Sequence, residues 1–85
     1  MSKKEKLKRR LAGNPTDFTY QELRTLLASM GYAEDQKGKT SGSRVSFVNL
    51  INKHVISLHK PHPGNILKRY QIIQLVDELR KEELL

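Results

Sequence analysis

The 85-residue sequence contains no cysteine, which removes disulfides, thiolate nucleophiles and cysteine-based zinc sites from consideration. This absence fits a reducing compartment, and the cytoplasm is the expected location. The chain also lacks an apolar stretch long enough to span a membrane, and its lysine-rich start is followed by no apolar segment. Neither a signal peptide nor a transmembrane helix is therefore expected, and no membrane partner is predicted.

Acidic residues are missing from one long stretch of the sequence. Residues 37–60 carry five basic side chains and no acidic one, and residues 1–10 carry six basic side chains against Glu5. The formal net charge of the chain is +7. A surface of one sign attracts polyanions, so nucleic acid is the leading class of partner. An acidic protein partner would also satisfy this charge.

The apolar spacing divides the chain into an arm and one small domain. Residues 1–15 predict a basic N-terminal helical arm that stops at a Gly-Asn-Pro sequence, and residues 16–85 predict the domain. The first helix of the domain carries a strong start signal, because Thr19 and Glu22 have the spacing of a capping box. Phe18 and Leu23 match a hydrophobic staple around the same start, and Gly31 suits the position just after the helix.

The rest of the domain predicts three strands and a final helix. Strands are expected over 32–36, 44–50 and 54–59, with a hairpin turn near Asn52. The final helix is expected from about Lys68 to Lys81, with an apolar stripe made of Ile72, Leu75, Val76 and Leu79 and widened by Ile66, Tyr70 and Ile73. The predicted fold class is α+β in the order α-α-β-β-β-α, with helices on one face of a three-stranded antiparallel sheet. This arrangement resembles the double-stranded-RNA-binding fold.

The loop "GKTSGSR", residues 38–44, is a candidate phosphate site. Its two glycines allow close backbone approach, and its hydroxyl groups and basic side chains suit phosphate oxygens. Glycine- and serine-rich hairpin loops are nevertheless common without any ligand. The side chains considered for phosphate contact are Lys39, Ser41, Ser43 and Arg44.

The segment "ISLHKPHPGN", residues 56–65, holds two of the three histidines. Histidine can exchange a proton near neutral pH, which metal-independent RNA cleavage requires, and Lys60 and Arg44 would stabilise charge on the phosphate. The neighbouring prolines hold His59 and His62 stiffly, although a purely structural turn would look the same. Strand alternation places His54 on the opposite face from His59. The histidines lack the carboxylates of a metal site, so neither a metal nor a cofactor is expected.

The segments "FTYQELRTLLASMGY", "GKTSGSRVSF" and "HVISLHKPHPGNILKRYQIIQLVDEL" together resemble the HicA toxins. These are small mRNA interferases of bacterial toxin–antitoxin modules, and the resemblance covers roughly residues 16–82. It implies a double-stranded-RNA-binding-like fold, ribosome-independent cleavage of mRNA, and neutralisation by a HicB-type antitoxin that covers the active surface. The free oligomeric state is left open, with a monomer expected.

The sequence departs from this family at one important position. Many members have Gly-Ser-His in the loop with a catalytic histidine, whereas this chain has Arg44 at that place. Arginine stays protonated at neutral pH, so catalysis is either lost or moved to another histidine. The family's His-Pro-Gly element matches residues 62–64, which makes His59 and His62 the candidate catalytic residues, with His59 preferred.

Three hypotheses follow. The first is a metal-independent endoribonuclease toxin, and the second is a non-catalytic RNA-binding module of the same fold. The third, a domain that binds an acidic protein, gives no reason for the Gly/Ser loop opposite the histidine turn. In the first hypothesis RNA phosphate is bound by Arg44, Lys60, Lys39, Ser41 and Ser43.

Overall fold

A computed structural model describes residues 2–35, 44–61 and 64–85. Its elements are α1 (Lys3–Ala12), α2 (Tyr20–Ser29), β1 (Tyr32–Asp35), β2 (Arg44–Asn49), β3 (Val55–His59) and α3 (Arg69–Lys81). The strands form one antiparallel sheet in the order β1-β2-β3. The predicted order of elements and the antiparallel sheet are confirmed.

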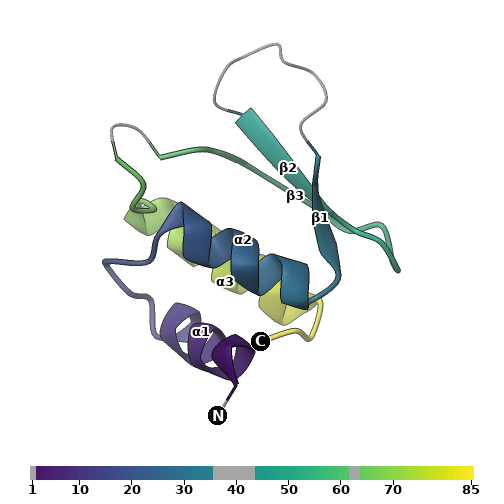
Figure 1. Cartoon of the computed structure of the whole chain (residues 1–85), viewed down its shortest axis with the longest axis horizontal. Coiled ribbons are helices and arrows are strands. Elements are labelled where there is room, and N and C mark those ends of the chain that lie inside the picture. Colours follow the sequence, from purple (N-terminus) through teal and green to yellow (C-terminus); the bar gives the residue numbers. More distant parts are fainter. Residues whose placement is uncertain (1, 36–43, 62–63) are drawn as a thin grey trace.

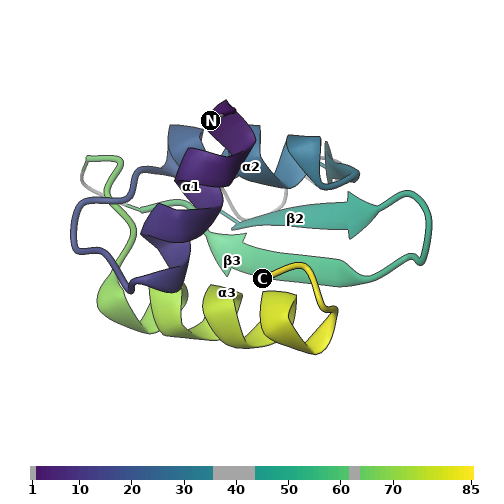
Figure 2. The ribbon, with the colours of Figure 1, turned by 90° about the horizontal axis from the view of Figure 1, so that it is seen from below.

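The described elements form layers, and no described helix lies over one face of the sheet. Helices α2 and α3 lie against the same face of the sheet, and α1 lies on the side of these helices away from the sheet (Figure 1). Seen from below, α1 crosses in front of α2 and α3 (Figure 2). We call the sheet face away from the helices the open face.

Helix α2 begins as the sequence predicts. The Thr19 side chain accepts a hydrogen bond from the Glu22 backbone N–H at 3.1 Å, and Glu22 Oε1 accepts one from the Thr19 N–H at 3.0 Å. Phe18 and Leu23 are both fully buried, as a hydrophobic staple requires. Gly31 follows the helix with φ of 95°, a backbone angle that favours glycine.

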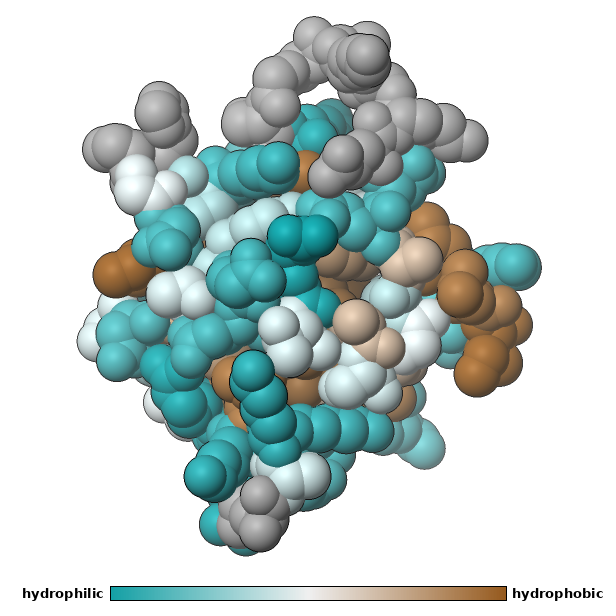
Figure 3. Space-filling model, in the orientation of Figure 1, coloured by the Kyte–Doolittle hydropathy of each residue, from teal (hydrophilic) through white to brown (hydrophobic). Residues whose placement is uncertain are grey.

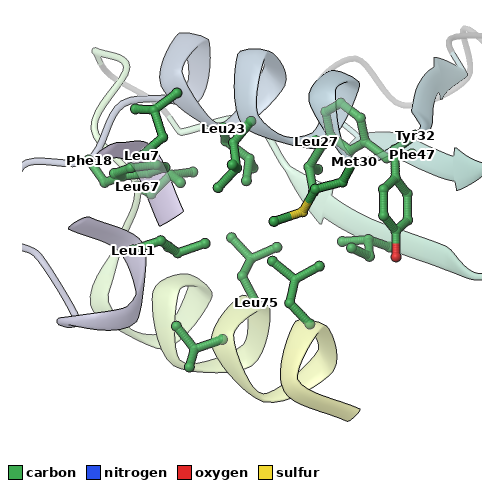
Figure 4. Close-up of a cluster of buried hydrophobic side chains, with 14 of the residues drawn as sticks. Leu7, Leu11, Phe18, Leu23, Leu27, Met30, Tyr32, Phe47, Leu67 and Leu75 are labelled. Carbon is green, nitrogen blue, oxygen red and sulfur yellow. The ribbon is translucent and has the colours of Figure 1, made fainter. Parts of the chain in front are cut away.

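The core lies between the sheet and the helices and extends to α1 (Figure 4). Val45 and Phe47 of β2 and Ile56 of β3 point into it, because alternate side chains of a strand face opposite ways. From the other side α1 contributes Leu7 and Leu11, which are 5% and 0% exposed. Helix α1 therefore packs into the same core as the rest of the chain.

Arg10 fixes α1 to the start of α2. Its guanidinium bonds Asp17 at 2.8 Å, pairs with Glu22, and lies over the Phe18 ring at 5.1 Å. Burial alone would lower the pKa of Arg10, but hydrogen bonding to Asp17 and the charges of both carboxylates raise it above its usual value. This arginine is thus a structural cation.

The apolar stripe of α3 is narrower than predicted. Ile66, Tyr70 and Ile73 were expected to widen it, but their side chains are 49%, 60% and 51% exposed. The polar residue Gln71 is buried on the core side of α3 instead, and it is 4% exposed. Hydrogen bonds make that burial possible, and hydropathy alone does not register them.

The turn between β2 and β3 is the predicted hairpin near Asn52. The Asn49 side chain accepts hydrogen bonds from the backbone N–H groups of Ile51 and Asn52 at 2.9 and 3.1 Å. Leu50 and Ile51 belong to this turn and are 63% and 86% exposed. Figure 3 shows an apolar projection at the right, where Figure 1 places the hairpin of β2 and β3.

Among the described residues, no helix has the length and apolar character needed to cross a membrane. The likeness to the double-stranded-RNA-binding fold stays a prediction.

Candidate nucleic-acid interface on the open face

The open face is lined by side chains that alternate with the buried ones along each strand. The strand registers pair Arg44 with His59, Ser46 with Ser57, and Val48 with Val55 across β2 and β3. The Arg44–His59 pair therefore lies at one end of the face, the hydroxyl pair in the middle, and the apolar pair at the hairpin end.

Arg44 and His59 are the sequence-predicted residues that the fold brings together. They are directly opposite each other in the antiparallel pair, and both are exposed. Directly opposite residues have Cβ atoms about 4.5–5.5 Å apart, within reach of one bound group. Neither side chain has a hydrogen bond or an ion pair with another described residue.

Hydroxyl groups continue the polar surface beside this pair. The Ser46 and Ser57 hydroxyl oxygens lie 3.1 Å apart and share a hydrogen bond. Asp35 of β1 pairs with Ser46 in register and lies on the same face. The open face consequently offers a cation, an imidazole, hydroxyl groups and the Asp35 carboxylate within two adjacent rows.

Lys60 is directed elsewhere than the sequence suggested. Its ammonium lies over the ring of Tyr20, 5.7 Å from the ring centroid, whereas Tyr20 belongs to α2 on the helix side of the sheet. Both residues line a hollow of about 210 Å³, together with Pro61, Gly64 and Asn65. An anion at this hollow would meet a cation that already contacts an aromatic ring.

The Tyr20 phenol that borders this hollow is neutral over the physiological range. Its ring is partly buried and its O–H donates to Glu34, and burial followed by this bond raises the pKa of Tyr20 far above its usual value. Glu34 also pairs with Arg24 at 3.0 Å, so this carboxylate joins β1 to α2.

The chain after His59 is tied down by a residue that the sequence did not indicate. Gln71 Nε2 donates to the His59 carbonyl at 2.8 Å, and Gln71 Oε1 accepts from the Lys68 N–H at 2.9 Å. Gln71 is the third residue of α3, where a glutamine suits a capping box. Lysine at the N-cap hides that signal, because its side chain cannot accept a hydrogen bond.

Backbone pairing with the start of α2 holds the far end of the same connection. The Tyr20 N–H donates to Asn65 O at 2.8 Å and the Leu67 N–H donates to Phe18 O at 2.9 Å. Gly64 has φ of 86°, which only glycine adopts without strain. The described ends of this connection, at residues 59–61 and 64–67, are therefore fixed by α3 and α2.

The remaining predicted site residues lie outside the described part of the chain. These residues are Lys39, Ser41, Ser43 and His62. Their predicted roles in phosphate binding and proton transfer stay predictions.

His54 faces the helices, as strand alternation predicts. Its Nδ1 lies 2.7 Å from the Tyr32 hydroxyl and its Nε2 lies 3.4 Å from Glu78 Oε1 of α3. Burial raises the pKa of Tyr32, a hydrogen bond with Asn49 partly opposes this, and the charges of Glu82 and Glu78 add to the rise. The phenol therefore stays protonated and can donate to the imidazole. His54 links the hairpin to α3 and takes no part in the open face.

The residue types on the open face suit phosphate binding and proton transfer. Arg44 supplies a permanent charge, while His59 supplies a group that can accept or donate a proton near neutral pH. Within the described residues, no group of three or more histidine and carboxylate side chains could hold a metal ion.

Comparison with protein-family models, with curated proteins and with solved structures finds no match for the chain.

Proposed function

We propose that the chain is a metal-independent endoribonuclease that cleaves mRNA and thereby arrests translation and growth, as the toxin of a type II toxin–antitoxin system. The observation that supports this proposal best is the cross-strand pairing of Arg44 with His59 on the open face. A proton-transfer group next to a permanent cation is the minimum that RNA cleavage without a metal requires.

In the proposed reaction His59 takes the proton of a ribose 2′-hydroxyl. The 2′-oxygen forms a bond to phosphorus, the bond from phosphorus to the 5′-oxygen breaks, and the departing 5′-oxygen takes up a proton. The products are a 2′,3′-cyclic phosphate and a 5′-hydroxyl end, and no metal or cofactor is consumed. His62 is the candidate for the second proton transfer.

Arg44 has the complementary role of stabilising charge. Negative charge grows on the phosphate oxygens as the 2′-oxygen attacks, and a guanidinium can donate two parallel hydrogen bonds to such oxygens. This role requires a permanent positive charge, which arginine has. Proton transfer would require a group that releases its proton near neutral pH, which arginine does not do. Arg44 in place of the loop histidine of HicA toxins is thus compatible with catalysis by His59.

The resemblance to HicA toxins also suggests the protein partner. A HicB-type antitoxin would inhibit the chain by covering the open face, where Val48 and Val55 adjoin the polar rows. A neighbouring open reading frame that encodes such a protein would support this partner, and its product should then block both RNA binding and growth arrest. Substitution of Val55 by Asp should weaken that inhibition.

The cleavage test uses purified chain and a defined RNA in the presence of a metal chelator. The expected result is cleavage with cyclic phosphate ends, and a loss of about 10²–10⁴-fold in rate for His59→Ala. Arg44→Ala should also slow cleavage and weaken RNA binding. Because both side chains are exposed, these variants should keep the stability of the parent.

His54→Ala is the matched control, because this histidine lies on the helix side of the sheet. This variant should be less stable than the parent. At temperatures well below its melting temperature it should still cleave RNA at the rate of the parent. If the parent binds RNA but leaves it intact, and its expression in bacteria spares growth and mRNA, the chain is the non-catalytic RNA-binding module instead. If His59→Ala cleaves as fast as the parent, the assignment of His59 is wrong.

A further inference from the structure

We infer that α1 is a second RNA-binding surface, on the side of the molecule opposite the open face, that contacts phosphates of long RNAs. The surface consists of five cations, which we call the α1 cations: Lys3, Lys4, Lys6, Lys8 and Arg9. This inference concerns binding alone, so it holds whether or not the open face cleaves RNA.

The α1 cations are available to a ligand. Four of them are exposed and Lys8 is partly exposed. None has a side-chain hydrogen bond or an ion pair with another described residue. Arg10, the sixth basic residue of α1, is excluded because Asp17 and Glu22 hold it. Figure 3 shows hydrophilic side chains over the lower part of the molecule, where Figure 1 places α1.

Repulsion among these charges makes an anionic partner favourable. Lys4 and Lys8 are four residues apart on the helix, a spacing at which like charges are neighbours and repel each other. Glu5 is the one acidic residue in α1. A polyanion would relieve the repulsion and release counterions, which is the main source of sequence-independent affinity for nucleic acid.

The surface is also preorganised. Leu7 and Leu11 are buried in the core, Arg10 fixes α1 to the start of α2, and the Ser2 hydroxyl caps the helix by accepting from the Glu5 N–H at 3.2 Å. Little backbone entropy is lost when a ligand binds such a helix. A ten-residue helix is about 15 Å long, which spans about four phosphates at about 3.4 Å each.

Nucleic acid fits this surface better than a membrane does. An interfacial helix inserts an apolar face into lipid, but the apolar face of α1 is already buried against α2 and α3. The exposed large apolar side chains of the described residues all belong to segments after residue 49, and none belongs to α1. The α1 cations therefore match a phosphate backbone rather than a lipid surface.

The test is RNA binding by the full chain as a function of salt. RNA methylated at every 2′-oxygen cannot be cleaved by the proposed route, so binding is measured apart from catalysis. We expect that substitution of Lys3, Lys4, Lys6 and Lys8 by Gln weakens binding of an RNA of about forty nucleotides at least tenfold at low salt. The magnitude of the slope of log K against log[salt] should fall by about 3, because each of the four lost phosphate contacts contributes about 0.7 to it.

Two comparisons locate the effect. An RNA of about six nucleotides is about 20 Å long, which is too short to reach from the open face around two helix layers to α1. Its affinity for the open face should therefore be the same in the α1 variant as in the parent. The charge-matched control replaces Lys53, Lys68, Arg69 and Lys81, all exposed and outside α1, by Gln. This control should lower the long-RNA affinity clearly less than the α1 variant does.

Several outcomes would overturn the inference. Equal losses in the two variants would mean that only net charge matters, and an unchanged salt slope would mean that α1 contacts no phosphate. An equal loss for the short RNA would mean that the α1 cations are not a second surface that only long RNAs reach together with the open face. A variant that loses binding to phosphatidylserine vesicles while keeping RNA affinity would make α1 a membrane surface instead.

Discussion

Single polar residues decide how the open face is held. Gln71 is 4% exposed, and its amide bonds the His59 carbonyl and the Lys68 N–H. Buried polar groups are costly unless both hydrogen-bond partners are present. One side chain thus joins the end of β3 to the start of α3, next to the proposed catalytic histidine.

Replacement of Gln71 by Leu should destabilise the protein by about 1–3 kcal/mol, because it leaves two polar backbone groups near the core without their partners. Urea unfolding measures this change. The matched control is Gln74→Leu, since Gln74 lies on the same helix but is exposed, and its side chain bonds that of Glu78 at 3.2 Å. Its effect should stay within about 0.5 kcal/mol, and equal losses in the two variants would contradict the role given to Gln71.

At the scale of elements, the two helices that cover the sheet begin differently. Helix α2 has a complete capping box, with reciprocal bonds between Thr19 and Glu22. Helix α3 has half of one, because Gln71 bonds back to Lys68 while the lysine side chain offers no acceptor. Lys68 has φ of −78° and ψ of 158°, the extended conformation of an N-cap.

Lys68→Asp should therefore stabilise α3 by about 1 kcal/mol relative to Lys68→Ala. Both variants remove the positive charge, so their difference isolates the new acceptor and its favourable position at the helix N-terminus. The measurement is the midpoint of thermal unfolding at constant ionic strength. If the alanine variant is as stable as the aspartate variant, α3 does not need a side-chain cap.

At the scale of the whole molecule, two tyrosines connect the layers. Tyr20 of α2 donates to Glu34 of β1, and Tyr32 of β1 contacts His54 beside α3. Burial is the first cause that raises the pKa of each phenol above its unfolded value of 10.0, with the neighbouring carboxylates adding to it. The folded state thus favours the protonated phenols.

The free energy of unfolding should fall as the pH rises above 10.0, the unfolded pKa of tyrosine. Below that pH the contribution of both phenols is fully present, and it is lost as the pH passes through the raised folded values. Urea unfolding from neutral to strongly alkaline pH measures the loss. Tyr20→Phe should show a shallower alkaline decline than the parent, and identical declines would exclude Tyr20 as the cause.

Local pattern was enough to predict most of the elements. The capping box at Thr19 and Glu22, the turn near Asn52 and the alternation of Val45 and Phe47 are each confirmed, because backbone hydrogen bonding and burial act over a few residues. The strand alternation also placed His54 away from His59 correctly. The resemblance to HicA toxins and the catalytic roles stay predictions.

Only the tertiary structure decided which side chains meet. The sequence placed Lys60 with Arg44, yet the Lys60 ammonium lies over Tyr20, and the pairing of Arg44 with His59 depends on a register set between two strands. Whether a residue of α3 is exposed, as Tyr70 and Ile73 are, or buried, as Gln71 is, depends likewise on which neighbouring elements pack against that side of the helix. The amino-acid sequence by itself determined the elements and the charge of α1, because these are local properties. The three-dimensional packing decided that α1 and the open face lie on opposite sides of the helix layer, because that arrangement arises only when segments distant in the sequence bury their apolar sides together.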